Sequence, residues 1–237
     1  MTLPVYYYHR VGPFRDGAPL KMNVAPDAFR EHMSVLARRA HPVPLGDLVA
    51  CARDRRPFPR GAVAVTFDDG YKDLLEFALP VLREFKIPAA FFIVSGGVGG
   101  NDAWVSIGGL PREPVMSWDD LKRLRDEGMT IGSHSATHAT LDGATAATLK
   151  REIEGSRHEL QANLGIEIRH FAYPQGRFSA EAEAEVARAG YEAGWATRKG
   201  RPLKGEDRMA IRRMPVSAYI RGGRFRWELL LMRLGLR

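Results

Sequence analysis

The stretch AVAVTFDDGY, residues 62–71, places two adjacent carboxylates directly after a continuous apolar run. A run of this length and composition is typical of a parallel strand that is buried on both faces. Asp68 and Asp69 are therefore expected at the carboxyl end of that strand. Taken alone, Asp-Asp-Gly after a strand is more typical of a turn than of a functional site.

The motif GSHSATH at 132–138 supplies the partners, because it carries His134 and His138 four positions apart. A single His-x-x-x-His is more typical of surface or capping positions. Combined with one carboxylate, however, two imidazoles form the ligand set of a catalytic divalent metal site with open positions. The second carboxylate, next to the first, suits a base for a metal-bound water. Together the two motifs predict a metal site.

Strand-like and helix-like segments alternate along the chain. The expected strands are Leu3–Tyr8, Ala62–Phe67, Ala89–Val94, Met129–Ser133, Ile168–Tyr173 and Tyr191–Thr197. The expected helices are Phe29–Arg39, Leu74–Phe85, Ser117–Glu127, Thr145–Leu164 and Ser179–Ala189. Repeated β-then-α units predict parallel strands joined by crossover helices. Six or seven such strands predict an α/β barrel, either closed or incomplete, formed by one domain over residues 1–237.

Parallel barrels carry their sites at the carboxyl ends of the strands. The polar motifs of this chain all follow strand-like runs: His9, Asp68-Asp69, His134 and Tyr173–Gly176. They are therefore expected to meet at one mouth. The glycine-rich stretch Gly96–Pro114 follows a strand at the same face and is expected to be a mobile loop over the site.

Composition excludes several classes of protein. The chain has 237 residues, of which 45% are hydrophobic, and its single cysteine, Cys51, allows neither an internal disulfide nor a thiolate zinc site. No apolar run approaches the roughly 20 residues of a membrane span. No secretory signal is visible in MTLPVYYYHRVG, which leads us to expect a cytoplasmic enzyme.

The net charge of +7 is concentrated at the end of the chain, where residues 198–237 contain only three acids. This bias favours an anionic partner or, alternatively, a solvated basic face, and no nucleic-acid signature is present. The tail at about 218–237 has apolar residues near helical spacing among arginines. These apolar residues are Phe225, Leu229, Met232 and Leu236, and Arg237 ends the chain. The tail is expected either to lie weakly on an anionic membrane surface or to dock on the barrel as a last helix.

The motifs TFDDG at 66–70 and HSATH at 134–138 resemble the hallmarks of the polysaccharide deacetylase family, carbohydrate esterase family 4. Three further segments, VYYYHRVG at 5–12, FAYPQG at 171–176 and RRMPV at 212–216, resemble a branch that includes deacetylases of bacterial poly-N-acetylglucosamine. The resemblance implies a distorted (β/α)7 barrel that acts on N-acetylated saccharides.

The resemblance also implies roles for individual residues. Asp69, His134 and His138 would hold one divalent metal ion, and Asp68 would be the general base. Gln175 would offer its backbone N–H to the oxyanion of the reaction. Zinc is our first choice of metal, although cobalt, nickel and iron also suit two nitrogens and one oxygen.

Two departures from the family pattern require substitutes. Ala172 stands where many members have an arginine that orients the base, and Arg213 is the candidate to replace it from another strand. The late histidine that protonates the leaving amine in many members is missing, since the last histidine here is His170. His9, at the end of the first strand, is the candidate acid.

We therefore expect a metal-dependent hydrolase that removes N-acetyl groups from an amino-sugar saccharide or glycan precursor. Trp104, Trp118 and Trp195 are candidates to stack on sugar rings or to pack in the core. Two alternatives remain: hydrolysis of another amide, such as a cyclic imide or a formyl group, or an inactive glycan-binding module. The sequence does not specify the sugar, the linkage or the oligomeric state.

Overall fold

A computed structural model describes residues 3–14, 22–105, 112–197, 200, 202–203 and 207–233. Its main sheet is parallel throughout and follows the order β10-β1-β5-β6-β7-β8-β9, with β4 paired to the start of β5. The strands are β1 (Val5–Tyr8), β4 (His41–Pro42), β5 (Ala62–Phe67), β6 (Ala89–Ile93), β7 (Thr130–Ser133), β8 (His170–Ala172), β9 (Ala193–Trp195) and β10 (Met214–Pro215).

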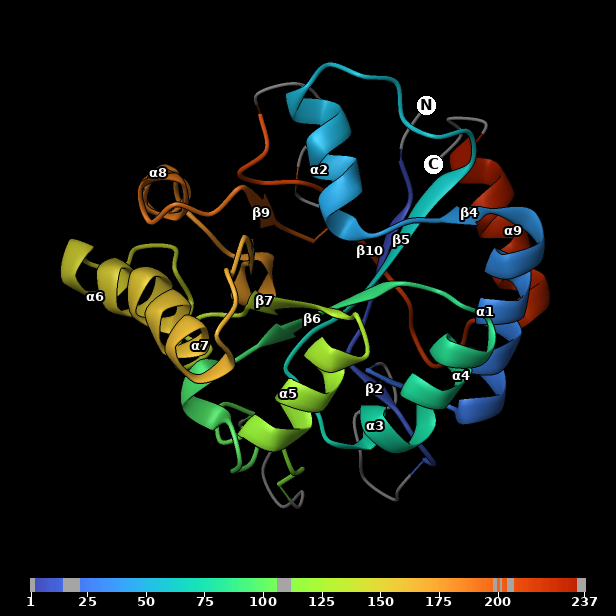
Figure 1. Cartoon of the computed structure of the whole chain (residues 1–237), viewed down its shortest axis with the longest axis horizontal. Helices are drawn as coiled ribbons and strands as arrows, with labels where there is room; N and C mark the ends of the chain where they lie inside the picture. The colour runs from blue at the N-terminus through green and yellow to red at the C-terminus, as the bar shows by residue number, and fades with distance from the viewer. Residues whose placement is uncertain are drawn as a thin grey trace.

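The sheet curls into a distorted barrel, as the sequence predicted (Figure 1). Its first and last strands are joined by the segment 211–215. Ile211 forms a parallel bridge with Trp195 of β9, and Met214 pairs with Tyr6 of β1. Residues between these two points, Arg213 among them, therefore lie at the seam of the barrel.

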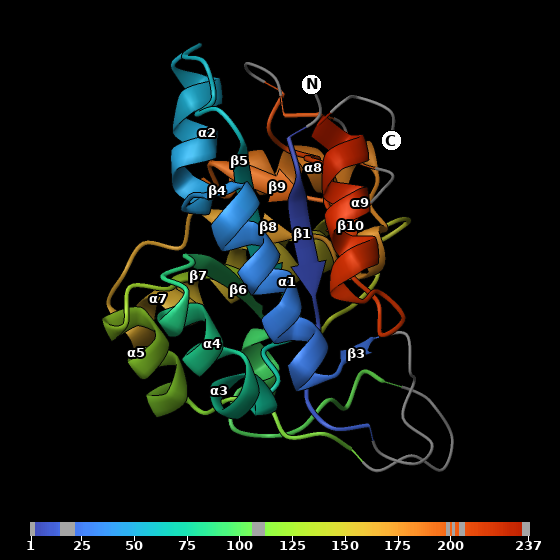
Figure 2. The same ribbon diagram turned by 90° about the vertical axis from the view of Figure 1, so that its right-hand side faces the viewer.

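Helices cover the outside of the barrel (Figure 2). They are α1 (Pro26–Arg39), α3 (Asp73–Phe77), α4 (Leu79–Glu84), α5 (Trp118–Asp126), α6 (Ala146–Lys150), α7 (Ser156–Leu164), α8 (Ala180–Arg188) and α9 (Gly222–Arg233). Along β5, Val63, Val65 and Phe67 pack in the outer core with these helices. Ala62 and Ala64 belong to a second, inner core.

The inner core is closed at one end by α2 (Leu45–Arg53), which the sequence analysis missed (Figure 1). Leu45, Leu48 and Val49 of this helix pack with the small inward residues of the strands. Because α2 covers the amino ends of the strands, only their carboxyl ends remain open for a site.

Two predicted helices are interrupted. The helix expected over 74–85 is divided into α3 and α4 at Ala78, just before Pro80, whose ring cannot follow a regular helical turn. The helix expected over 145–164 contains a π-helical turn, Arg151–Gly155, between α6 and α7.

The short strands β2 (Arg10–Val11) and β3 (Asn23–Val24) pair with one another and were not predicted. Helix α5 begins with a capping box formed by Ser117 and Asp120.

The last helix, α9, docks on the barrel against α1. The Phe225 ring lies 4.3 Å from the His32 ring and 4.8 Å from the Tyr6 ring, measured between centroids. Leu229 is also buried. The face that carries Phe225 and Leu229 is therefore not available to a membrane, while Leu236 and Arg237 lie outside the described residues. Among the described helices, none has the length and apolar character needed to span a membrane.

Candidate active site

Three predicted metal ligands meet at the carboxyl ends of β5 and β7. The Oδ1 atom of Asp69 lies 3.3 Å from Nε2 of His138 and 3.5 Å from Nε2 of His134. Two ligands bound about 2.1 Å from a tetrahedral ion stand about 3.4 Å apart, so these separations suit a common ion. Asp69 Oδ1 is buried and receives no hydrogen bond within the described structure. The three residues therefore fit a divalent metal.

The environment of His134 prepares it as a ligand. Its Nδ1 lies 2.8 Å from the carbonyl oxygen of Ala172. Because a carbonyl can only accept, Nδ1 donates and Nε2 keeps its lone pair directed at Asp69. Burial lowers the pKa of His134 to about 4, so the imidazole is neutral near pH 7.

Backbone strain is concentrated around these ligands. Asp69, Ser135, His138 and Gln175 all have positive φ angles, of 72°, 68°, 61° and 57°. The described residues contain only two other such non-glycine positions, Arg55 and Lys86. A left-handed backbone costs a residue with a Cβ about 1–2 kcal/mol, and such strain typically collects at functional sites.

A buried glutamate holds the loop between the two histidines. Thr137 donates to the Glu152 carboxylate twice, from its backbone N–H at 2.8 Å and from its hydroxyl at 2.9 Å. The N–H of Ala136 donates to the carbonyl of Glu152 at 3.0 Å. Within the loop itself, the His138 N–H donates to the Ser135 hydroxyl at 2.9 Å. Glu152 is fully buried and belongs to the π-helical turn.

The sequence analysis missed Glu152. Its only signal in the sequence is an acid beside Ile153 in a helical pattern, which a regular helix would not turn toward the histidine loop. The π-helical turn changes the phase of the helix locally, and such turns often accompany functional sites.

Asp68 faces Arg213 inside the barrel. The two guanidinium nitrogens Nη1 and Nη2 donate to the two carboxylate oxygens at 2.6 and 2.8 Å, and Nη1 also donates to the Thr66 hydroxyl at 3.1 Å. The guanidinium lies 4.9 and 5.0 Å from the ring centroids of Tyr7 and Phe92. Burial alone would raise the pKa of Asp68, but Arg213, followed by His134, holds it below its ordinary value. Asp68 is therefore a carboxylate with a fixed orientation.

A cavity of about 340 Å³ opens over these groups. Its lining includes His9, Asp68, Asp69, His134, His138 and Gln175. The half-buried His9 ring lies edge-on to Tyr7, with 5.5 Å between centroids. The backbone N–H of Gln175 has no hydrogen-bond acceptor within the described residues. The structure thus brings every proposed site residue except Arg213 to the cavity wall, and Arg213 lies behind Asp68.

Trp104 covers one side of the same cavity. Its ring stacks on His138 with 5.5 Å between centroids and 21° between planes. The loop that carries Trp104 is held by ion pairs at its other end. There Arg10 bridges Asp73 at 2.7 Å and Glu113 at 2.8 Å. The part of the loop expected over 96–114 that is described is therefore anchored, and residues 106–111 lie outside the described structure.

The other aromatic and histidine candidates are placed elsewhere. Trp195 is fully buried in the inner core, and Trp118 is partly buried against the outer core at the start of α5. His170 is buried with its ring beside that of Trp195. None of the three lines the cavity over the metal ligands.

Comparison with known proteins assigns the family. The family model named polysaccharide deacetylase matches residues 55–194, a span that holds Asp68, Asp69, His134 and His138. The chain belongs to the polysaccharide deacetylase family. The resemblance to carbohydrate esterase family 4 is thereby confirmed, and so is the barrel expected from it.

Two curated relatives of this polysaccharide deacetylase come from bacteria. YxkH of Bacillus subtilis is 25% identical over 94% of this chain and 74% of its own length. Its name gives polysaccharide deacetylase as an assigned, not an established, activity. A poly-β-1,6-N-acetyl-D-glucosamine N-deacetylase of Staphylococcus aureus is 26% identical over 58% of this chain and 48% of its own length. The chain therefore matches about half the length of this second relative.

Solved structures show the same fold. The deacetylase PplD of Streptococcus pyogenes, in complex with acetate, superposes with a TM-score of 0.80 at 19% identity and covers 94% of this chain and 96% of its own. IcaB of Ammonifex degensii superposes with a TM-score of 0.79 at 22% identity and covers 96% of this chain and 97% of its own.

Proposed function

We propose that this protein is a metal-dependent hydrolase that removes N-acetyl groups from an amino-sugar saccharide or glycan precursor. The observation that carries the proposal is the pairing, in one cavity, of the Asp69, His134 and His138 cluster with an Asp68 carboxylate oriented by Arg213. The relative from Staphylococcus aureus, whose name states this reaction on poly-β-1,6-N-acetyl-D-glucosamine, supports the choice of substrate class.

The chain divides the chemistry among its own residues. A divalent ion held by Asp69, His134 and His138 supplies, when bound, a Lewis acid that polarises an acyl oxygen and acidifies water. Asp68 accepts a proton from the attacking water. Arg213 leaves lone pairs of that carboxylate available, while its two parallel hydrogen bonds prevent the carboxylate from rotating.

Charge and proton transfer then depend on two groups at the cavity wall. The Gln175 N–H, which the left-handed backbone at that residue holds in the cavity wall, would stabilise the negative charge that develops on the acyl oxygen. His9 would protonate the leaving amine, because an amine is a poor leaving group without a proton. Trp104 would form an aromatic wall for a sugar ring.

A different amide on the same barrel is the second candidate. A divalent ion held by Asp69, His134 and His138 would polarise the carbonyl of other amides as well as that of an N-acetyl group. An inactive glycan-binding module is disfavoured, because a binding module has no need of a buried Asp68–Arg213 pair beside the ligand cluster.

Metal analysis combined with product detection tests the proposal. The purified chain is expected to hold one divalent ion and to release acetate from members of a panel of N-acetylated saccharides. Formate or a ring-opened imide as the only product would favour the second candidate. A metal-loaded chain that releases no acid from any substrate, including an aryl acetate, would overturn the proposal.

A further inference from the structure

A second surface gathers on the outer side of α9, away from the catalytic cavity. The described residues leave four large hydrophobic side chains exposed, and three of them, Tyr219, Trp227 and Leu230, belong to this last segment. Trp227 and Tyr219 are each 60% exposed, and Leu230 is 45% exposed. A docked helix that has already buried Phe225 and Leu229 would ordinarily turn polar residues outward. The exposed aromatic and aliphatic groups therefore need another explanation.

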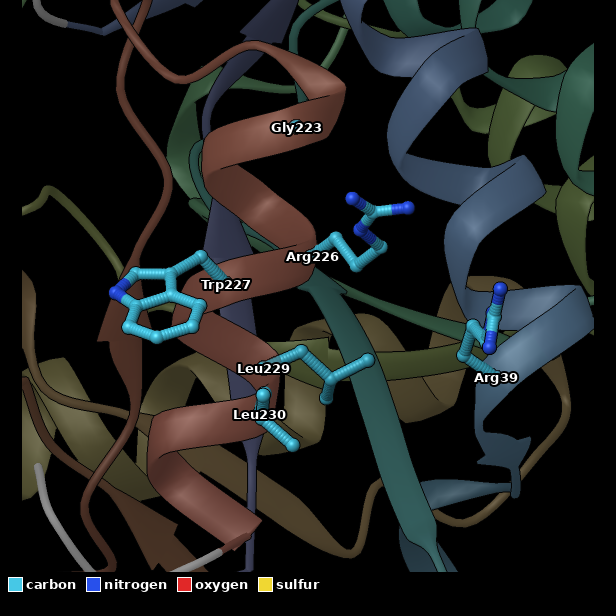
Figure 3. A pocket seen from close by; sticks show the side chains of 6 residues that line it. All are labelled: Arg39, Gly223, Arg226, Trp227, Leu229 and Leu230. Atoms are coloured by element: carbon cyan, nitrogen blue, oxygen red, sulfur yellow. The ribbon is translucent and has the colours of Figure 1, made fainter.

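The same surface carries positive charge without acidic partners. A groove between α1 and α9 is lined by Arg39, Gly223, Arg226, Trp227, Leu229 and Leu230. Arg39 and Arg226 extend from the two helices into the space between them, and Trp227 projects from the other side of α9 (Figure 3). Within the described residues neither arginine forms an ion pair, whereas their neighbours Arg221 and Arg224 are paired with Asp27 and Glu228.

We propose that this surface binds the face of a lipid bilayer that contains anionic phospholipid. Guanidinium groups bind phosphate through paired hydrogen bonds, and tryptophan is favoured where headgroups meet acyl chains. Exposed leucine and tryptophan gain by leaving water, which an anionic lipid surface allows together with charge neutralisation. The surface consists of Arg39, Arg226, Trp227 and Leu230.

Other occupants fit these residues less well. A soluble acidic glycan would neutralise the arginines but offers no apolar phase for Trp227 and Leu230. A second copy of the chain, packed through a two-fold axis, would bring both unpaired arginines of each copy into one interface, and this surface itself contributes no acidic residue to pair with them. An anionic bilayer satisfies both the charge and the apolar side chains.

The position of α9 is compatible with catalysis at a membrane. The helix begins near the carboxyl end of β1 and runs back along the side of the barrel (Figure 2). A bilayer along its outer face would therefore lie beside the barrel and not across the mouth of the cavity.

Vesicle co-sedimentation of the full chain at low salt tests the proposal. Binding is expected to vesicles with about 30% phosphatidylglycerol and not to phosphatidylcholine alone, with roughly a fivefold contribution from each basic group near the surface. Arg39→Ser/Arg226→Ser should therefore weaken binding by about 25-fold. Trp227→Ser should weaken it as well, and the fluorescence blue shift on binding should disappear in that variant.

A charge-matched control separates this surface from net charge. Arg60→Ser/Lys86→Asn removes two exposed cations that also lack ion pairs within the described residues, and it should keep wild-type binding. Equal losses in the two double variants would overturn the proposal, since binding would then follow net charge alone. Failure of the wild type to bind anionic vesicles would overturn it too, and binding of only a soluble acidic polysaccharide would assign the surface to a glycan.

Discussion

At the scale of single residues, two adjacent carboxylates are given different environments by one backbone change. Asp68 directly follows β5 and points into the barrel, where Arg213 donates hydrogen bonds to both carboxylate oxygens. Asp69, with a φ of 72°, turns toward the two histidines. The left-handed residue thus directs neighbouring side chains, which a continued strand would place on opposite faces, to one cavity.

The two carboxylates should respond differently to removal of charge. Asp69→Asn should lose metal affinity, because the neutral amide is a weaker ligand. Asp68→Asn should keep the metal but lower the rate of deacetylation by roughly 100- to 10,000-fold, as expected for a general base. Metal content and kcat are measured for both, and the opposite pattern would reverse the two roles.

Thermal unfolding is the necessary control for Asp68→Asn. That substitution leaves the buried Arg213 without a counter-charge, and breaking a buried pair typically costs about 3–5 kcal/mol. Rates are therefore compared only at temperatures where the variant remains folded, and the double variant Asp68→Asn/Arg213→Met removes the uncompensated charge.

The assignment of His9 makes a substrate-dependent prediction. His9→Ala should slow N-acetyl hydrolysis by roughly 100-fold or more, while an aryl acetate, whose phenolate leaves without a proton, should be affected much less. Metal content should stay unchanged, since His9 is not among the three clustered ligands. Equal losses on the two substrates would leave the leaving-group acid unassigned.

At the scale of elements, the π-helical turn connects the long α6–α7 helix to the metal loop. It presents Glu152 to the backbone between His134 and His138, so the geometry of the ligands depends on a residue that contacts neither of them. Residues that orient ligands in this way typically alter metal affinity about 10- to 100-fold when replaced.

Replacement of Glu152 should therefore weaken metal binding before it affects the fold. Glu152→Gln keeps the size of the side chain but cannot accept both hydrogen bonds from Thr137, so a rise of about 10-fold or more in the metal Kd is expected. Glu154→Gln is the matched control, since Glu154 lies in the same turn but pairs with Arg188 and Lys150 instead. Competition with a metal chelator gives both Kd values, and equal values would contradict a role for Glu152.

At the scale of the whole molecule, α9 joins the end of the chain to the first strand and the first long helix. His32 lies at the centre of this contact: its Nε2 is 2.7 Å from the Ile220 carbonyl oxygen, and its ring stacks on Phe225. Burial lowers the pKa of His32 from 6.5 to about 4. The folded protein therefore holds this histidine neutral, whereas the unfolded chain protonates it below about pH 6.5.

Acid should consequently destabilise the folded state through this contact. As pH falls from about 6.5 to 4, His32 becomes protonated in the unfolded state but stays neutral in the folded state, so the free energy of unfolding decreases. For this residue the decrease is about 2 kcal/mol at pH 5. His32→Phe should reduce the difference in urea-unfolding free energy between pH 7 and pH 5. The buried His134 and His170, whose pKa values burial also lowers to about 4, should leave some acid sensitivity.

A His32→Phe variant with the wild-type pH difference would show that His32 does not titrate differently in the folded and unfolded states.

Local sequence patterns were enough to predict most strands of the main sheet, most of the helices around it and a cluster of candidate metal ligands. Apolar runs such as Ala62–Phe67 specify buried parallel strands locally, and parallel strands bring their carboxyl ends to one edge, so the Asp68-Asp69 pair could be grouped with His134 and His138. The choice of Asp69 as the ligand rested on the resemblance to the family. The interrupted helices and α2 were not foreseen, because they depend on what each segment packs against.

The contacts between residues far apart in the chain follow from the folded arrangement and could not be predicted from local patterns. Arg213 reaches Asp68, 145 positions away, because the barrel closes between β9 and β1. Glu152 reaches the histidine loop because a π-helical turn changes the direction of its side chain. Phe225 faces inward because its ring stacks on that of His32 in α1. Sequence periodicity shows which face of a helix or strand is apolar, but tertiary packing determines what that face contacts. These contacts fix the orientation of the Asp68 carboxylate and leave the outer side of α9 exposed.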